Sequence, residues 1–196
     1  VHDIEEIVVI NQPKEAFRLR RQPLSSSSLS ASDINRNGVR DLRDVSAYVP
    51  SFVMPNYGAR YTSSIYLRGF GSRINNPAVG IYVDDVPVIS KSAYNSHFYD
   101  VARIDVLRGP QGTLYGQNTE GGIVRIYTKN PMQYSGTDVK LGIGSYLWRN
   151  VEVGHYGKIN DNVAFSVAGF YDGQNGFLHN SALDSRADLM NESGGR

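Results

Sequence analysis

The chain has 196 residues, of which 40% are hydrophobic and 20% charged, so it is long enough to bury a core and too apolar for a disordered tail. Its 20 basic and 19 acidic side chains give a formal net charge of +1, which offers no electrostatic reason to expect nucleic acid or an anionic surface as a partner. The absence of cysteine excludes disulfides and thiolate metal sites, and no run of residues approaches the about 20 apolar residues of a membrane helix.

The first predicted elements are an extended segment and a helix. Residues 4–10 (IEEIVVI) are largely β-branched and favour a strand, whereas the Pro and Ser tract over 23–28 is typical of a linker. Ser32-Asp33-Ile34 offers a helix cap. Apolar side chains then recur at helical spacing over 39–48 and predict a helix that ends at Pro50. We expect its buried face to contain Val39, Leu42, Val45 and Val49.

Short strands follow and predict a small α+β unit that extends to about Pro131. The strand segments are 64–70, 79–89, 103–107 and 122–128. Asp84-Asp85 predicts a hairpin turn, and residues 98–103 predict a single helical turn. The long polar loops are 56–63, 71–77 and 90–97. The expected fold class of this part is α+β, with a mixed sheet and short helices.

Beyond Pro131 the pattern becomes a regular alternation of apolar and polar residues. Val139, Leu141 and Ile143 alternate with polar residues and glycine, and the same period continues over 150–154 and 163–171. Amphipathic strands of this kind, joined by a tight turn at 160–162 and followed by a longer polar segment, are typical of an outer-membrane barrel. A soluble antiparallel meander shares this alternation and stays open as the alternative.

No arrangement of residues predicts an enzyme. Gly116 and Gly121 have the spacing of a phosphate-binding loop, but Gly122 and Ile123 stand where that loop needs a lysine and a hydroxyl. The four histidines are far apart and predict no metal site, and no nucleophile, base and orienting group can be placed together. We therefore expect no catalysis, no cofactor and no metal. Tight turns and a close approach of backbones in a confined space explain the glycines better.

Several motifs, taken in order, resemble a known family. IEEIVVI, a helix, YLRGF, VGIYVDDVPV and LRGPQGTLYG followed by EGGIVRIYTKNP are similar to the plug domain of TonB-dependent outer-membrane receptors. The resemblance implies a TonB-box segment and linker over 1–28, a plug domain over 29–131 and the start of a truncated transmembrane barrel over 132–196. Membrane barrels begin at about eight strands, so these strands cannot close by themselves and we expect the chain to be a fragment.

The resemblance implies a receptor in the outer membrane, in contact with its lipid, with the plug inside the barrel lumen and the N-terminus in the periplasm. Substrate then binds from outside, and TonB with its inner-membrane energising complex supplies energy from the periplasmic side. The expected cargo is a scarce nutrient, in the first place a ferric siderophore or another iron complex, with haem and cobalamin also open. The alternative is a periplasmic signalling or secretion module that binds protein partners without transport.

The resemblance also implies three groups of site residues. The TonB box corresponds to Ile4, Glu5, Glu6, Ile7, Val8, Val9 and Ile10, which add to a sheet edge of TonB; a terminal strand in the plug's own sheet is the alternative. Arg68 and Arg108, with Glu120 as a nearby acid, resemble the arginines that latch plug to barrel, unless each caps local carbonyls. The substrate-binding residues expected in the long loops are Arg60, Arg73, Asn75, Asn76, Lys91, Tyr94 and His97.

Overall fold

The structure is a computed structural model, and it describes residues 25–57, 63–73, 76–95, 97–110, 112–115, 117–176, 178–182, 185–186 and 190–196. The chain divides into two compact units. The first contains Val1–Ser96 and Arg103–Tyr127, and the second contains His97–Ala102 and Thr128–Arg196. Residues 4–10, predicted as the TonB-binding strand, lie outside the described residues, as do Arg60 and Asn75.

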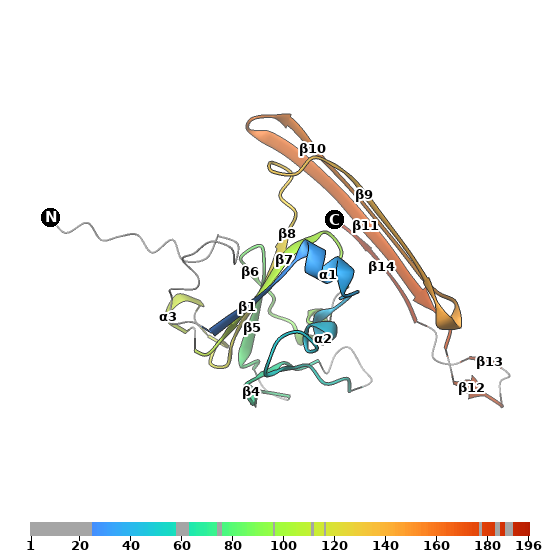
Figure 1. Ribbon diagram of the computed structural model, residues 1–196. Helices are drawn as coiled ribbons and strands as arrows, with labels where there is room; N and C mark the ends of the chain where they lie inside the picture. Colours follow the sequence, from blue (N-terminus) through green and yellow to red (C-terminus); the bar gives the residue numbers. More distant parts are fainter. Residues whose placement is uncertain are drawn as a thin grey trace. The chain divides into compact units, whose positions relative to one another are not determined.

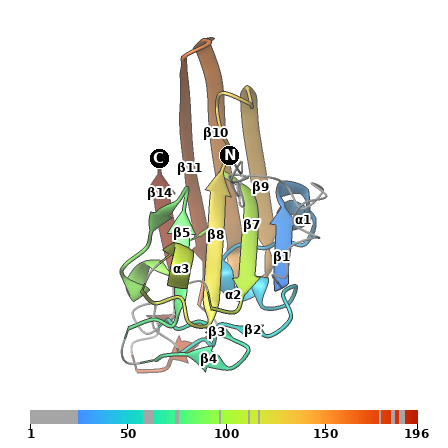
Figure 2. The same cartoon turned by 90° about the vertical axis from the view of Figure 1, so that its left-hand side faces the viewer.

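A five-stranded mixed sheet forms the centre of the described part of the first unit, in the order β1-β7-β8-β5-β6 (Figure 1). Its strands are β1 (Ser25–Ser30), β5 (Val79–Val83), β6 (Val86–Pro87), β7 (Val101–Arg108) and β8 (Gly122–Thr128). Figure 2 shows β1, β7, β8 and β5 side by side, with β1 antiparallel to β7 and β5 parallel to β8. Branched apolar side chains such as Ile81, Ile104 and Val124 are at most 2% exposed and form the core. The sheet confirms the predicted α+β class.

Two short helices follow β1 in the chain. α1 (Ala31–Arg36) begins with a capping box, in which Ser30 Oγ accepts from the Asp33 N–H and the Asp33 carboxylate accepts from the Ser30 N–H. α2 (Leu42–Val45) begins after Asp41, whose side chain caps it from an extended backbone. The helix predicted over 39–48 is therefore too long. Its predicted face is correct, because Val39, Leu42, Val45 and Val49 are at most 4% exposed.

Shorter elements complete the described part of the first unit. β2 (Phe52–Val53), β3 (Tyr66–Leu67) and β4 (Phe70–Gly71) pair as a small antiparallel sheet. The 3-10 helix η3 (Lys91–Ala93) and the short helix α3 (Gly112–Tyr115) lie in the connections between strands. Across the part of the chain that the structure describes, no helix is long and apolar enough to cross a membrane.

Two predictions about local structure are wrong. The helical turn expected over 98–103 does not form, because β7 already begins at Val101 and Arg103 pairs with Ser30. The tract expected to be a linker over 23–28 contains most of β1, in which Ser25–Ser30 pair with β7. Serine side chains do not stop this pairing, since a strand ladder is made by backbone N–H and C=O groups. The strands predicted at 79–89, 103–107 and 122–128 are confirmed, with the turn at Asp84-Asp85.

The described part of the second unit contains a four-stranded antiparallel sheet in the order β14-β11-β10-β9 (Figure 1). Its strands are β9 (Gly136–Gly144), β10 (Trp148–Asn160), β11 (Val163–Gln174) and β14 (Met190–Gly195). The 3-10 helix η4 (Ser145–Leu147) joins β9 to β10, and residues 161–162 make the predicted tight turn before β11. The separate hairpin of β12 (His179–Asn180) and β13 (Ser185–Arg186) precedes β14.

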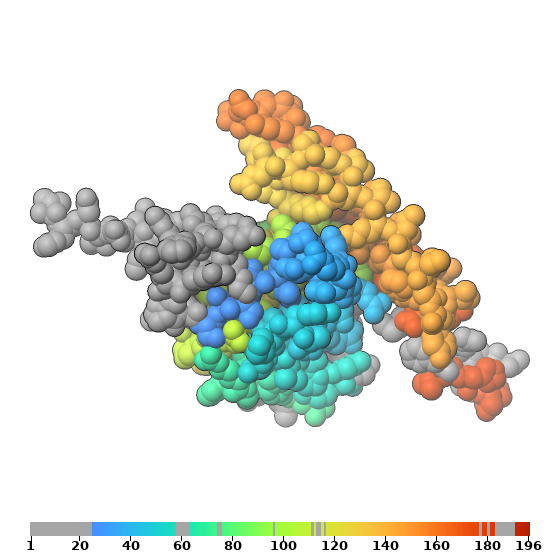
Figure 3. Space-filling view, in the orientation of Figure 1, coloured from blue at the N-terminus to red at the C-terminus, as the bar shows by residue number. Residues whose placement is uncertain are grey.

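The two faces of this sheet differ in polarity, as the alternation predicts. One face exposes apolar side chains, and Leu141, Ile143 and Val167 are 75%, 91% and 63% exposed. In the space-filling view the yellow-orange atoms of β9 lie at the surface along the strand (Figure 3). The opposite face carries polar side chains, including those of Lys140 and Glu152, which are in contact with each other. The sheet is therefore amphipathic, as the start of a membrane barrel must be.

Candidate functional site

The two arginines predicted to latch plug to barrel have different surroundings. Arg108, at the end of β7, donates to the Pro50 carbonyl at 3.3 Å and to Ser27 Oγ and the Ser26 carbonyl at 3.1 and 3.4 Å. It caps neighbouring groups of its own unit, which is the alternative that the sequence left open. Arg68 is exposed in the turn between β3 and β4, with φ of 53°.

Glu120, the acid proposed for these arginines, is also exposed. Among the described residues, no hydrogen bond or ion pair joins Arg68, Arg108 and Glu120. The structure therefore does not bring the three predicted latch residues together, and the role of Arg68 toward a barrel glutamate stays a prediction.

Some of the predicted ligand-binding residues do come together in the first unit. Lys91 Nζ donates to the carbonyls of Ser72 and Arg73 at 3.0 and 3.2 Å, and burial lowers the pKa of Lys91. The guanidinium of Arg73 lies over the ring of Tyr57, 4.5 Å from its centroid. Asn76 is exposed close by in sequence. The Lys91 ammonium therefore holds the backbone of the loop before β5, while the Arg73 guanidinium packs on Tyr57.

Tyr94 lies deeper than the sequence predicts for a residue of a surface loop. Its side chain is 2% exposed, and burial, followed by the nearby Tyr82, raises the pKa of Tyr94 to about 12. It lines a pocket with Ile81, Tyr82 and Asn118 among others. Tyr94 is therefore a buried phenol that lines this pocket, and its raised pKa keeps it protonated at neutral pH.

A buried charged cluster on β7 and β8 was not predicted. The Arg125 side chain is 6% exposed and pairs with Asp85 in the turn between β5 and β6. Tyr127 lies between the guanidiniums of Arg125 and Arg103, at 4.9 and 4.3 Å from their carbons. Burial opposes the positive charge of Arg125, but hydrogen bonds to Asp85 and Tyr115 raise the pKa of Arg125 above its ordinary value. Burial raises the pKa of Tyr127 to about 12. This cluster ties the β5–β6 turn to β8.

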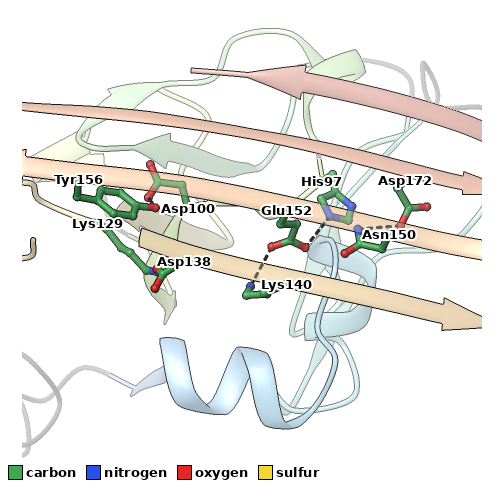
Figure 4. A network of polar contacts seen from close by, with 9 residues as sticks. All are labelled: His97, Asp100, Lys129, Asp138, Lys140, Asn150, Glu152, Tyr156 and Asp172. Atoms are coloured by element: carbon green, nitrogen blue, oxygen red, sulfur yellow. Dashed lines mark hydrogen bonds and ion pairs between the residues drawn. The ribbon is translucent and has the colours of Figure 1, made fainter. Parts of the chain in front are cut away.

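In the second unit, residues 97–102 lie against the polar face of the strands (Figure 4). His97 Nε2 is 3.2 Å from Glu152 Oε1 on β10, and Lys140 Nζ on β9 donates to Glu152 Oε2 at 2.9 Å. The His97 ring stacks on Phe170 of β11, with centroids 4.5 Å apart. The side chains of His97 and Glu152 are 7% and 14% exposed. His97, predicted as a ligand contact, instead contacts Glu152 of β10 and Phe170 of β11.

Further polar contacts extend this arrangement. The Tyr156 hydroxyl on β10 donates to the Asp100 carboxylate, and Lys129 pairs with Asp138 on β9. The Lys129 N–H donates to the Asp100 carbonyl at 3.0 Å, which joins the segment before β7 to the residue after β8. Further along β10, the Asn150 amide donates to Asp172 of β11 at 3.2 Å. For the residues on β9, β10 and β11, the sequence signal was only their place on the polar face of each strand.

Comparisons with known proteins agree with one another. A family model described as TonB-dependent Receptor Plug Domain matches residues 18–123. The pesticin receptor of Yersinia pestis is 36% identical over 130 residues, which cover 65% of this chain and 19% of that protein. The vitamin B12 transporter BtuB of Vibrio vulnificus is 26% identical over 164 residues, which cover 78% of this chain and 25% of that protein. The chain spans about a fifth to a quarter of the length of these curated relatives.

Among solved structures, the ferric yersiniabactin uptake receptor FyuA of Yersinia pestis is similar with a TM-score of 0.78 and 31% sequence identity. The match covers 88% of this chain and 28% of that one. The similarity therefore extends over both compact units, the small mixed sheet and the amphipathic strands.

Proposed function

Because the chain belongs to the TonB-dependent receptor plug family, we propose that it forms the plug and the first barrel strands of an outer-membrane receptor that takes up a nutrient with energy from TonB. The observation that carries the proposal is the order of the two units. A plug-like mixed sheet is followed directly by strands with one exposed apolar face and one polar face. A wall between lipid and a water-filled lumen needs both faces.

The proposed location follows from the strands of the second unit. Leu141 and Ile143 on β9, and Val167 on β11, lie on the face that would contact lipid. The polar face, with Lys140, Glu152 and Asp172, would line the lumen together with the plug. Polar side chains facing a lumen avoid the cost of burying charge in hydrocarbon.

The proposed cargo is a ferric siderophore or another anionic iron complex. Two observations support this choice. The solved receptor FyuA is described as taking up ferric yersiniabactin. In this chain, Lys91 and Arg73 belong to loops proposed to face the outside and contact each other through the Arg73 carbonyl, and basic residues there favour an anionic ligand. Cobalamin is the second candidate, because BtuB is described as a vitamin B12 transporter.

The proposed contact with TonB is the segment 4–10. Its β-branched residues favour an extended chain, and an extended segment can add to a sheet edge of TonB through main-chain hydrogen bonds. Substrate binding and energy coupling then occur on separate parts of the receptor, so a variant can lose one and keep the other.

A proline substitution in this segment tests the proposed function. Val8→Pro removes one backbone donor, so we expect TonB-dependent uptake to be lost while substrate still binds. Uptake of radioactive iron as ferric yersiniabactin is measured in a strain that lacks its own receptor, beside binding at low temperature. Val8→Ala keeps the N–H and is the matched control, with normal uptake expected. Uptake by the proline variant at the native rate would contradict the proposed role of this segment.

A further inference from the structure

The apolar face of the four-stranded sheet carries a cation at one end. Arg149 precedes Val151 and Val153 on β10, and the alternation of a strand puts these three side chains on the same face. The register places Arg149 beside Ile143 of β9, which is 91% exposed, and beside Gly173 of β11. Arg149 is exposed as well. A guanidinium therefore stands in the row that follows the apolar residues of the proposed lipid-facing surface.

Two side chains from neighbouring strands form a cluster with this guanidinium. Arg149 Nη2 donates to the Tyr171 hydroxyl of β11 at 3.4 Å, and that hydroxyl donates to Asn191 Oδ1 of β14 at 3.1 Å. The hydroxyl and the amide lie over Gly173, where an added Cβ would be 2.8 Å from the Tyr171 hydroxyl and 2.9 Å from Asn191 Oδ1. Glycine at this position thus leaves the space in which the side chains meet. We call Arg149, Tyr171 and Asn191 the Arg149 cluster.

The charge of the Arg149 cluster is not offset within the described part of the chain. No carboxylate of the described residues forms an ion pair with Arg149. β10 already has β9 on one side and β11 on the other, so a strand added at either edge of this sheet would lie about 10 Å or more from β10. A lone charge on a lipid-facing surface is costly. An anion that approaches from the membrane side is therefore the natural partner of this guanidinium.

The Arg149 cluster lies at the outer end of the proposed barrel wall. Outer-membrane barrels have short turns on the periplasmic side and longer loops outside. Residues 161–162 form the tight turn between β10 and β11, and the longer connection 175–189 follows β11 at the opposite end. Figure 1 shows the hairpin of β12 and β13, which belongs to this connection, beyond that end of the long strands. Arg149 directly follows the first residue of β10 and lies at the same end, where lipid headgroups of the outer leaflet are expected.

We propose that the Arg149 cluster binds a phosphate group of an outer-leaflet lipid. The inference rests on the proposed function, because it needs the apolar face to lie in a membrane, and it adds a specific lipid headgroup as a partner. A guanidinium has five N–H donors, of which the contact with Tyr171 uses one, and it can form two parallel hydrogen bonds with a phosphate. The acyl chains of the same lipid lie along the apolar row of Val151 and Val153. The site therefore selects a phosphorylated lipid over a free anion.

Binding of a phosphorylated lipid to the purified receptor tests the inference. The probe is lipid A that carries its phosphates, added to the receptor in a neutral detergent, and the dissociation constant is measured by thermophoresis. Lipid A without its phosphates and inorganic phosphate are the comparison ligands. We expect Arg149→Gln to bind phosphorylated lipid A at least about fivefold more weakly than the native receptor. Lys158→Gln is the matched control with native affinity expected, because it removes the same charge near the other end of β10, where Lys158 pairs with Asp161.

Three results would each overturn the inference. The first is equal affinity of the native receptor and Arg149→Gln for phosphorylated lipid A, or an equal loss in Arg149→Gln and Lys158→Gln. The second is equal affinity of the native receptor for lipid A with and without phosphates, and the third is binding of inorganic phosphate as tight as that of the lipid; neither depends on a variant that must fold. TonB-dependent uptake is measured separately in cells. A receptor that transports but ignores lipid phosphate refutes this inference alone, whereas absence of uptake refutes the proposed function.

Discussion

At the residue scale, Gly122 at the start of β8 shows where the fold requires a glycine. Gly122 has φ of +138°, and a Cβ built there would lie 2.2 Å from the Leu107 carbonyl oxygen and 3.0 Å from Leu67 Cδ1. No side chain fits between these backbones. The sequence prediction that glycine serves a close approach of backbones is confirmed at this position.

Replacing this glycine tests the packing. Gly122→Ala forces a Cβ into a backbone contact at a left-handed φ, so we expect a loss of about 2–4 kcal/mol in the free energy of unfolding, measured with urea. Gly38→Ala is the matched control, because Gly38 has φ of +62° and open space around it. The control should lose only about 1 kcal/mol. Equal losses at the two sites would show that backbone strain alone, and not the close approach, matters.

A second prediction at this scale concerns Tyr94 at alkaline pH. Burial raises its pKa to about 12 in the folded protein, above the ordinary value of 10.0. The protonated phenol therefore contributes stability that is complete below pH 10 and is lost as the pH rises toward 12. We expect Tyr94→Phe to unfold at a higher pH than the native chain, as followed by circular dichroism. If Tyr94→Phe and the native chain unfold at the same alkaline pH, ionisation of the Tyr94 phenol does not limit stability at alkaline pH.

At the scale of elements, the strands of the second unit are defined by their two faces. β9 presents Val139, Leu141 and Ile143 on one side and Lys140 on the other, where it meets Glu152 of β10. The register pairs Leu141 with Val151 and Val139 with Val153, so the apolar residues of neighbouring strands lie in rows. A shift by one residue would turn every side chain to the other face, which strongly fixes this register.

A charge placed on the apolar face tests its contact with lipid. Leu141→Lys should destabilise the barrel by about 2–4 kcal/mol, because a charged side chain is costly near the middle of the bilayer. Ser166→Lys puts the same charge on the opposite face of β11 and should have little effect. The fraction of receptor that resists unfolding in detergent at room temperature measures both. Equal effects of the two lysines would contradict a lipid-facing surface on β9.

At the scale of the whole molecule, the ligand face of the plug is proposed to combine several loops. Arg73 and Lys91 meet through a hydrogen bond although they lie in different loops. Tyr57 packs against Arg73, so a third loop segment joins them. Several basic residues on one set of loops favour an anionic ligand more than any one of them does alone.

Removing the cations tests this proposal. We expect the triple variant Arg60→Ala, Arg73→Ala and Lys91→Ala to bind ferric yersiniabactin at least about tenfold more weakly, as measured by the dissociation constant on whole cells. The difference from the native receptor should shrink at high salt, because salt screens exposed charges. Native affinity in the triple variant would remove these residues from the ligand site.

The local pattern of the sequence was enough for the family, the class of fold and most strands. YLRGF, LRGPQGTLYG and EGGIVRIYTKNP carried the resemblance, and the alternation from Val139 onward predicted amphipathic strands that the structure confirms. These features depend on residues a few positions apart. The same local pattern failed at residues 23–28, because a serine tract forms a strand only when β7 is there to pair with it.

What the sequence by itself determined, then, is the order of the parts and which face of each strand is apolar. Only the tertiary structure decided which polar groups meet: His97 with Glu152, 55 positions away, and Arg125 with Asp85, 40 positions away. It also turned Arg108 toward β1 and buried Tyr94. The reason is physical. The periodicity of apolar residues in the sequence shows which face of its own helix or strand a side chain lies on. The hydrogen-bond or ion-pair partner of that side chain depends on how separate elements pack and on the cost of leaving a buried charge unpaired.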